Sequence, residues 1–167
     1  MRYDMKAWVA ELAESRRPLP LLSFPSAQLT SASVYEITHD AQKQTEGILA
    51  AARRMPAAAA VCMMDLSLEA EAFGCKLTAS ANEVPTVTGI LISDEDEAHA
   101  LAIPPVGAGR TALYIKAAAD AKAQIHDRPV LAGMIGPFSL AGRLMDVQNC
   151  KSPSENSITG IIIAPIQ

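Results

Sequence analysis

The stretch RPVLAGMIGPFSLAGRL, residues Arg128 to Leu144, indicates the class of fold to which this chain belongs. Its apolar run, 129–135, predicts a buried parallel strand, and Gly136-Pro137 ends that run before a helical pattern begins. In α/β proteins, catalytic and ligand-binding groups collect where such strands end. The sequence therefore places a candidate site at this strand end.

An earlier segment, AAAAVCMMDLSLEAEAFG at 57–74, repeats the same layout. It is apolar as far as Met64 and then presents a carboxylate, Asp65. A short helix is expected over 66–73, and Gly74 is placed to cap its C-terminus. Two strand ends of this kind suggest one rim that carries a site.

The remaining pattern alternates helices with strands. The spacing predicts helices at 3–15, 34–54 and 110–126 and after Pro137, strands at 18–24, 57–64 and 129–135, and a loop at 25–33. Between the second and third strands we expect extended segments at 75–77 and 87–91, a helix from a Ser93 cap to Leu101, and a Pro/Gly linker at 103–109. This order predicts an α/β fold with a parallel sheet and right-handed crossovers.

Three strands leave sheet edges open, which is an aggregation hazard. We therefore expect part of a larger fold that self-associates through those edges into a homo-oligomer. The pattern ends after residue 147, and the apolar run 158–163 could be one more strand that no helix follows.

Composition narrows the function classes. The chain has 167 residues, of which 50% are hydrophobic and 19% charged, as in one ordinary folded domain. A net charge of −4 gives no reason to bind nucleic acid or an anionic membrane, and no apolar run approaches the ~20 residues of a membrane span. The N-terminal segment is charged throughout, unlike a secretory signal, and three cysteines do not make a disulfide framework. These features favour the cytoplasm.

Four segments resemble the uroporphyrinogen decarboxylase superfamily, which also contains corrinoid:thiol methyltransferases such as methylcobamide:coenzyme M methyltransferase. They are RRPLPLLSF, MDLSLEAEAFGCKL, NEVPTVTGILISDEDEAHAL and RPVLAGMIGPFSLAGRLMDV, in the family's order within 1–147. The resemblance implies a TIM-type (α/β)8 barrel, of which residues 1–147 would be the N-terminal part with about the first three parallel strands. Residues 148–167 would be a divergent C-terminal tail.

Particular positions separate the branches of this family. Where the decarboxylases carry two arginines that hold substrate carboxylates, this chain has Ser23 and Ala27. Arg143 stands where they have a tyrosine, whereas Asp65 matches their aspartate. The resemblance therefore favours methyl transfer from a methylated corrinoid protein to a small thiol such as coenzyme M. Uroporphyrinogen decarboxylation (porphyrin biosynthesis), or an inactive fragment or binding module of the same fold, remains an alternative.

The methyltransferase branch implies a zinc ion that binds the thiol as a thiolate, which then attacks the cobalt-bound methyl group. The family's zinc ligands are a His-x-Cys pair and a later Cys in the second half of the barrel. We expect no such ligands here, because no two His or Cys residues have the spacing of a chelate. A corrinoid is the expected methyl donor.

Five residues are candidates for the site. Asp65 could be catalytic, orienting substrate or a bound water, or it could be the N-cap of the following helix. For substrate binding, Gly136, Phe138 and Ser139 could line a pocket, or they could form a strand-end turn that binds nothing. Arg143 could bind an anionic group, or it could be a solvated side chain.

For several other residues the sequence also allows a structural or a functional role. Glu69 and Glu71 could be rim carboxylates, although such positions are more often solvated on a helix. Cys62 is expected to be a packed thiol, whereas Cys75 could be exposed. The methionines at 63, 64, 134 and 145 are expected to fill the core.

Overall fold

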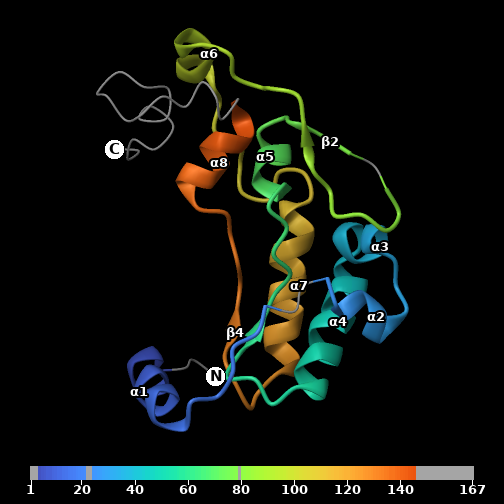
Figure 1. Cartoon of the computed structure of the whole chain (residues 1–167), viewed down its shortest axis with the longest axis vertical. Helices are drawn as coiled ribbons and strands as arrows, with labels where there is room; N and C mark the ends of the chain where they lie inside the picture. Colours follow the sequence, from blue (N-terminus) through green and yellow to red (C-terminus); the bar gives the residue numbers. More distant parts are fainter. Residues whose placement is uncertain (1–3, 22–23, 79, 146–167) are drawn as a thin grey trace. The chain divides into compact units, whose positions relative to one another are not determined.

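The computed structural model describes residues 4–21, 24–78 and 80–145 (Figure 1). The chain divides into two compact units, and each is described by itself. Unit 1 is the described part of Met1–Met64, Ala81–Glu83 and Leu113–Gly133. Unit 2 is the described part of Asp65–Ser80, Val84–Ala112 and Met134–Gln167.

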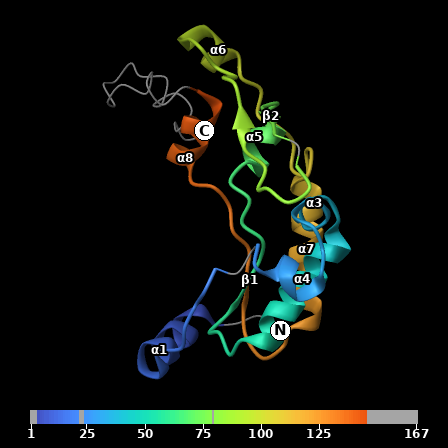
Figure 2. The ribbon, with the colours of Figure 1, turned by 45° about the vertical axis from the view of Figure 1, so that its right-hand side comes forward.

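Unit 1 contains a pair of parallel strands covered by two long helices. Strand β1 (Ala60–Val61) pairs with β4 (Val130–Leu131), with Ala60 opposite Val130. Helices α4 (Ala41–Arg54) and α7 (Thr111–Gln124) lie side by side in Figures 1 and 2. The alanines on the strand and on α7 let backbones approach closely, and the core that results consists of Ile48, Ala60, Cys62, Ala121 and Ile125.

Three further helices belong to unit 1: α1 (Met5–Ser15), α2 (Ser26–Thr30) and α3 (Val34–His39). The carboxylate of Asp4 accepts hydrogen bonds from two amides in the first turn of α1 and so caps this helix. On the same helix, the indole Nε1 of Trp8 donates to the carbonyl of Ala58 at 3.2 Å. This bond connects α1 to the segment that leads into β1.

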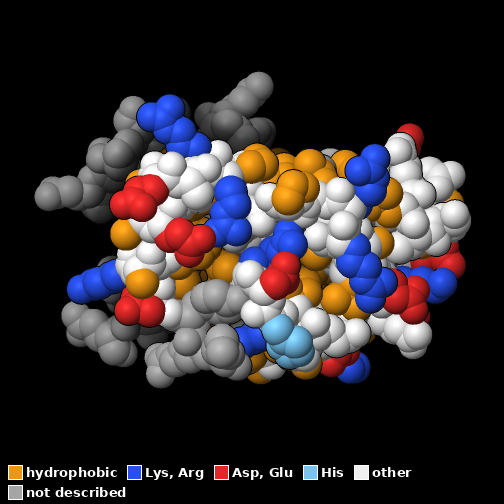
Figure 3. All heavy atoms as spheres, turned by 90° about the horizontal axis from the view of Figure 1, so that it is seen from below, with side chains coloured by type: hydrophobic (Ala, Val, Ile, Leu, Met, Phe, Trp, Pro, Cys, Tyr) orange, Lys and Arg blue, Asp and Glu red, His pale blue; other side chains and the backbone are white. Residues whose placement is uncertain are grey.

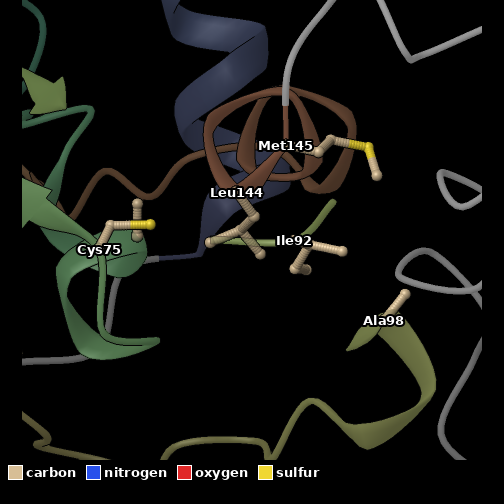
Figure 4. Close-up of a cluster of buried hydrophobic side chains, with 6 residues drawn as sticks. Cys75, Ile92, Ala98, Leu144 and Met145 are labelled. Carbon is tan, nitrogen blue, oxygen red and sulfur yellow. The ribbon is translucent and has the colours of Figure 1, made fainter. Parts of the chain in front are cut away.

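Unit 2 is built from short elements: α5 (Leu68–Ala72), β2 (Lys76–Leu77), β3 (Val87–Thr88), α6 (Glu95–Ala100) and α8 (Pro137–Leu144). Strands β2 and β3 are antiparallel. Ile92 forms a parallel bridge with Met145, and Figure 4 shows Ile92 beside Leu144 at the end of α8. The buried members of this core are Ala70, Cys75, Ile92, Ala98, Leu144 and Met145.

The single helix expected at 34–54 is wrong, because the chain breaks at Asp40. Asp40 adopts an extended conformation between α3 and α4, and its carboxylate accepts hydrogen bonds from the amides of Gln42 and Lys43. An Asp side chain that bonds nearby amides in this way starts a new helix rather than continuing the old one. The loop expected at 25–33 is also wrong in part, since α2 lies within it.

The strands are shorter than the sequence predicts. The strand expected at 57–64 is reduced to β1, and the one at 129–135 to β4. Pro18 and Pro20 lack the amide that a strand ladder requires, and the described residues of 18–24 form no strand. The parallel α/β pairing is confirmed, but the described sheet is small and open, so the closed barrel remains a prediction.

Other predictions are confirmed. The helices expected at 3–15, 66–73 and 110–126 correspond to α1, α5 and α7. Gly74 has a φ of 106° and ends α5, with the amide of Cys75 donating to the carbonyl of Ala70 at 3.0 Å. The α6 cap is Asp94 rather than Ser93. The predicted tail, 148–167, and the run 158–163 within it lie outside the described residues.

The surface mixes charges with apolar side chains. On the face seen in Figure 3, Lys and Arg side chains alternate with Asp and Glu, and hydrophobic side chains lie exposed between them. Opposite charges placed in this way largely offset one another. Within the described part of the chain, every helix is too short or too polar to cross a membrane.

Candidate functional site

Asp65, which directly follows the segment that contains β1, is fully buried in unit 2, with a side-chain exposure of 0%. Its Oδ1 accepts hydrogen bonds from the amide of Ser67 at 2.9 Å and from its hydroxyl at 2.6 Å. This is an Asx turn, which directs the chain from the strand toward α5. The N-cap of α5 is Ser67, so the alternative that Asp65 caps the helix is wrong.

Arg110, immediately before α7, binds Asp65 from the other side. Its Nη1 lies 2.8 Å from Asp65 Oδ2, and its Nε lies 2.6 Å from Glu71 Oε2. Its Nη2 also donates to the Ser67 hydroxyl at 3.4 Å. Only 7% of the arginine side chain is exposed, so its pair with Asp65 is shielded from solvent, whereas the Glu71 side chain is 29% exposed.

Arg110 was not predicted as a site residue from the sequence. It lies 45 residues from Asp65 and directly after a segment that the sequence presents as a Pro/Gly linker. Gly107 and Gly109 have φ values of 89° and 54°, conformations that glycine adopts without strain, and so the loop can turn sharply before the arginine. A glycine-rich turn followed by a cation was visible in the sequence, but its distant partner was not.

The environment of Asp65 fixes its charge. Burial raises the pKa of Asp65, but the hydrogen bonds from Ser67 and the hydrogen bond and charge of Arg110 outweigh burial, so the pKa lies below its ordinary value. Both carboxylate oxygens are engaged. This arrangement suits a carboxylate that holds the backbone in place better than one that takes up and releases a proton.

Glu69 and Glu71 are partly buried and bonded to other groups, whereas the sequence also allowed freely solvated positions on the helix. Glu71 pairs with Arg110, and Glu69 Oε1 accepts the amide hydrogen of Ile135 at 3.1 Å. Glu69 Oε2 is buried and has no hydrogen-bond partner in the described structure. The Glu69 bond therefore connects α5 with the segment that follows β4, which brings the two predicted strand ends together.

A groove of about 730 Å³ lies within unit 2 beside these groups. It brings together three of the predicted residues, Phe138, Ser139 and Arg143, all on α8. Phe138 is 70% exposed, and Arg143 is the only charged side chain in the described lining. The other lining residues are Leu66, Val87, Gly89, Ile90, Ile135, Gly142 and Met145.

Two predicted residues lie outside this lining. Gly136 is the N-cap of α8 and is exposed. Asp65 is buried and does not line the groove, whereas the next residue in the chain, Leu66, does. The structure thus connects Asp65 to the groove through the backbone rather than through its own carboxylate.

Both described thiols are buried. Cys62 is buried, as expected, and burial raises its pKa to about 11. Cys75, which the sequence left open to exposure, is buried as well, and burial raises its pKa. Cys150 lies outside the described residues.

The methionines follow the prediction in part. Met63 and Met145 are buried, and Met64 is half-buried. The expectation that Met134 fills the core is wrong, because it follows β4 in an extended segment and is 79% exposed.

The described residues do not fit a zinc ion. In the described parts of the chain, no group of three His, Cys, Asp or Glu side chains is placed to hold a metal. The buried carboxylate of Asp65 and the partly exposed carboxylate of Glu71 already share Arg110, whose positive charge opposes a second cation. No catalytic step is therefore assigned to zinc here.

Comparison with known proteins places the chain in a family. The model for uroporphyrinogen decarboxylase (URO-D) matches residues 20–154. The chain belongs to the uroporphyrinogen decarboxylase family. The match spans both strand ends of the candidate site, including Asp65 and the α8 residues of the groove. No curated protein matches the sequence.

A solved structure supports the same fold. A methyltransferase from Methanosarcina mazei superposes with a TM-score of 0.68 at 21% identity, over 79% of this chain and 41% of that chain. At this level of identity the likeness concerns the fold alone. This URO-D family chain spans about two fifths of the length of that methyltransferase.

Proposed function

We propose that this chain forms a wall of the substrate site in a URO-D family enzyme that transfers a methyl group from a methylated corrinoid to a thiol such as coenzyme M. The observation that carries this proposal is the groove of unit 2, whose described lining is mainly apolar with Arg143 as its one charged side chain. In the methyltransferase branch, a zinc ion supplies the activated thiolate. The residues described here would bind and orient the corrinoid.

The chemistry of a corrinoid suits this lining. Its macrocycle has broad apolar faces, and its side chains are mostly neutral amides. Phe138, which is 70% exposed at the start of α8, offers an aromatic surface to such a face. Arg143 and Ser139 supply donors for amide carbonyls or for a phosphate of the nucleotide tail.

The charges disfavour a carboxylate-rich porphyrinogen. Beside the groove, Asp65 and Glu71 share the guanidinium of Arg110, and Glu69 accepts the amide hydrogen of Ile135. Even with Arg143 of the groove lining included, these three carboxylates and two guanidinium groups carry a net negative formal charge, which disfavours a ligand with many carboxylates. Ala27, at a position where the decarboxylases carry an arginine, is 8% exposed, and Ser23 lies outside the described residues.

Ligand binding tests the proposal. The 167-residue chain is titrated with hydroxocobalamin and, separately, with uroporphyrin, and binding is followed by equilibrium dialysis. We expect the cobalamin to bind more tightly, and Phe138→Ala and Arg143→Ala to weaken it by about tenfold each. Lys116→Met, which alters an exposed ion pair in unit 1, is the matched control and should leave binding unchanged.

The alternatives predict different results. Tighter binding of uroporphyrin would favour the decarboxylase, and binding of neither ligand would contradict both activities. Incubation with methylcobalamin, coenzyme M and zinc then tests whether this chain completes the reaction alone. Because its described residues do not fit zinc, we expect the methylcobalamin absorbance to persist, and loss of that absorbance would mean that this chain also activates the thiol.

A further inference from the structure

Arg110 holds two elements of unit 2 at once. Its Nη1 and Nε lie on different carboxylates, Asp65 at 2.8 Å and Glu71 at 2.6 Å. A guanidinium can do this because its donors are fixed in one plane, whereas an ammonium group presents a single charged point. One side chain therefore sets both the turn at 65–67 and the orientation of α5.

Those two elements form part of the groove. Leu66 lies in the turn between Asp65 and Ser67, and it lines the groove. Glu69 lies on α5 and accepts the amide hydrogen of Ile135, which lines the groove from the segment after β4. A displacement of Arg110 would thus reach both lining residues through one or two hydrogen bonds.

We propose that Arg110 is the positioning residue of this groove. By holding Asp65 and Glu71 together, it fixes Leu66 and, through Glu69, Ile135 in the geometry that receives the ligand. Asp65 then acts through the backbone and does not contact the ligand. The direct contacts come from α8, on which Phe138, Ser139 and Arg143 lie. Only the nature of the ligand rests on the function proposed above.

The first test needs no ligand. The amide of Ser67 donates to Asp65 Oδ1 at 2.9 Å, so its NMR chemical shift follows the protonation of Asp65. The charged and polar groups on the elements packed around Asp65 include Arg110 and Ser67, which bond to it, and Glu69 and Glu71 on α5. Arg143 lies on α8, the helix packed against α5. In the unaltered chain the Ser67 shift should change below the ordinary pKa of an aspartate, since these contacts favour the carboxylate.

Arg110→Met should move that midpoint to higher pH and also shift the amide signals of Leu66 and Ile135. Arg110→Lys keeps the positive charge, but a lysine cannot hold both carboxylates in the same way. The Ile135 amide signal of this variant should therefore return only part of the way to its position in the unaltered chain. If Arg110→Met does not fold, Glu71→Gln breaks one of the two pairs and should still shift Ile135. Unchanged Leu66 and Ile135 signals in a folded variant would overturn the proposal.

The second test uses hydroxocobalamin. Arg110→Met should weaken the binding of hydroxocobalamin by about tenfold. The affinity of Arg110→Lys should lie between those of Arg110→Met and the unaltered chain. Asp65→Asn keeps the shape of the side chain and should weaken binding less than Arg143→Ala, because Asp65 lies beneath the groove. If Asp65→Asn weakens hydroxocobalamin binding as much as Arg143→Ala does, the indirect role of Asp65 is contradicted. If the unaltered chain binds no cobalamin, the proposed function fails, whereas the NMR result still decides the role of Arg110.

Discussion

Unit 1 packs Ile48 and Ile125 against the small side chains of Ala60 and Ala121, whereas unit 2 adds to its apolar cluster a buried arginine held by two carboxylates. Apolar contacts have no preferred direction, so they tolerate small changes in shape. A buried ion pair needs both partners in place, since a lone buried charge is costly. The comparison teaches that the groove of unit 2 depends on a few directional contacts.

The largest effect should follow the loss of one buried charge. Asp65→Ala leaves Arg110 buried between Glu71 and an empty space, and we expect a loss of about 3–5 kcal/mol in the local stability of unit 2. Hydrogen exchange measured by mass spectrometry over peptides from 65–80 reports that loss. Protection that stays within about 1 kcal/mol of the unaltered chain would remove the distinction between the units.

Truncation in the apolar core should cost somewhat less. Ile48→Ala creates a cavity beside Ala121 and Cys62, and we expect a loss of about 2–4 kcal/mol in unit 1. Trp8, the single tryptophan of the chain, contacts Ala58 of unit 1, so its fluorescence during urea unfolding follows this unit. Ile48→Val is the matched control and should lose no more than about 1.5 kcal/mol. Equal losses for the two variants would indicate that the site collapses without a cavity.

The next largest effect should be the loss of stability of unit 2 at acid pH. The pKa of Asp65 is lower folded than unfolded, so the stability that it contributes is complete above the unfolded value of about 3.9 and is lost as the pH falls through the folded value. Protonation leaves the side chain in place, and its effect should be smaller than that of Asp65→Ala. Hydrogen exchange of 65–80 at pH values from 6 to 3 measures it. Asp65→Asn should flatten this pH dependence, and a slope that persists in the variant would assign it to other carboxylates.

The sequence predicts the local elements well because their signals are local. The amphipathic spacing of α1 and the glycine that ends α5 follow from residues within a few positions of one another. The strand lengths could not be predicted in this way, since a strand extends only where a neighbour pairs with it, and Pro18 and Pro20 remove donors from the first.

The same distinction between local and long-range signals applies to the candidate site. Phe138, Ser139 and Arg143 could be grouped from the sequence because one helix carries all three next to a predicted strand end. Arg110 was missed because its partner lies 45 residues away, and only the fold brings the two together. Asp65 could be singled out from the sequence, but its contacts could not: its two oxygens are bonded to Ser67 and Arg110.

A polar contact made within one turn should have a modest effect. Asp40→Ala removes the carboxylate that accepts hydrogen bonds from Gln42 and Lys43 at the start of α4. We expect unit 1 to lose about 1 kcal/mol, because water can partly replace the cap at this exposed position. Urea unfolding followed by Trp8 fluorescence measures the change. Asp40→Ser is the control and should retain most of the stability, whereas a loss as large as that of Ile48→Ala would show that Asp40 has a further partner.

The smallest effect should come from an ion pair of nearly the same length as that of Arg110. Lys116 Nζ lies 2.7 Å from Asp120 Oδ2, but 65% of the lysine side chain is exposed, against 7% of Arg110. Water screens such a pair and competes for both groups, so Lys116→Met should change the stability of unit 1 by no more than about 0.5 kcal/mol. Trp8 fluorescence in urea, at low and high salt, measures it. A loss above about 1 kcal/mol would mean that distance rather than burial sets the strength of these pairs, and the contrast between the two units would then need another cause.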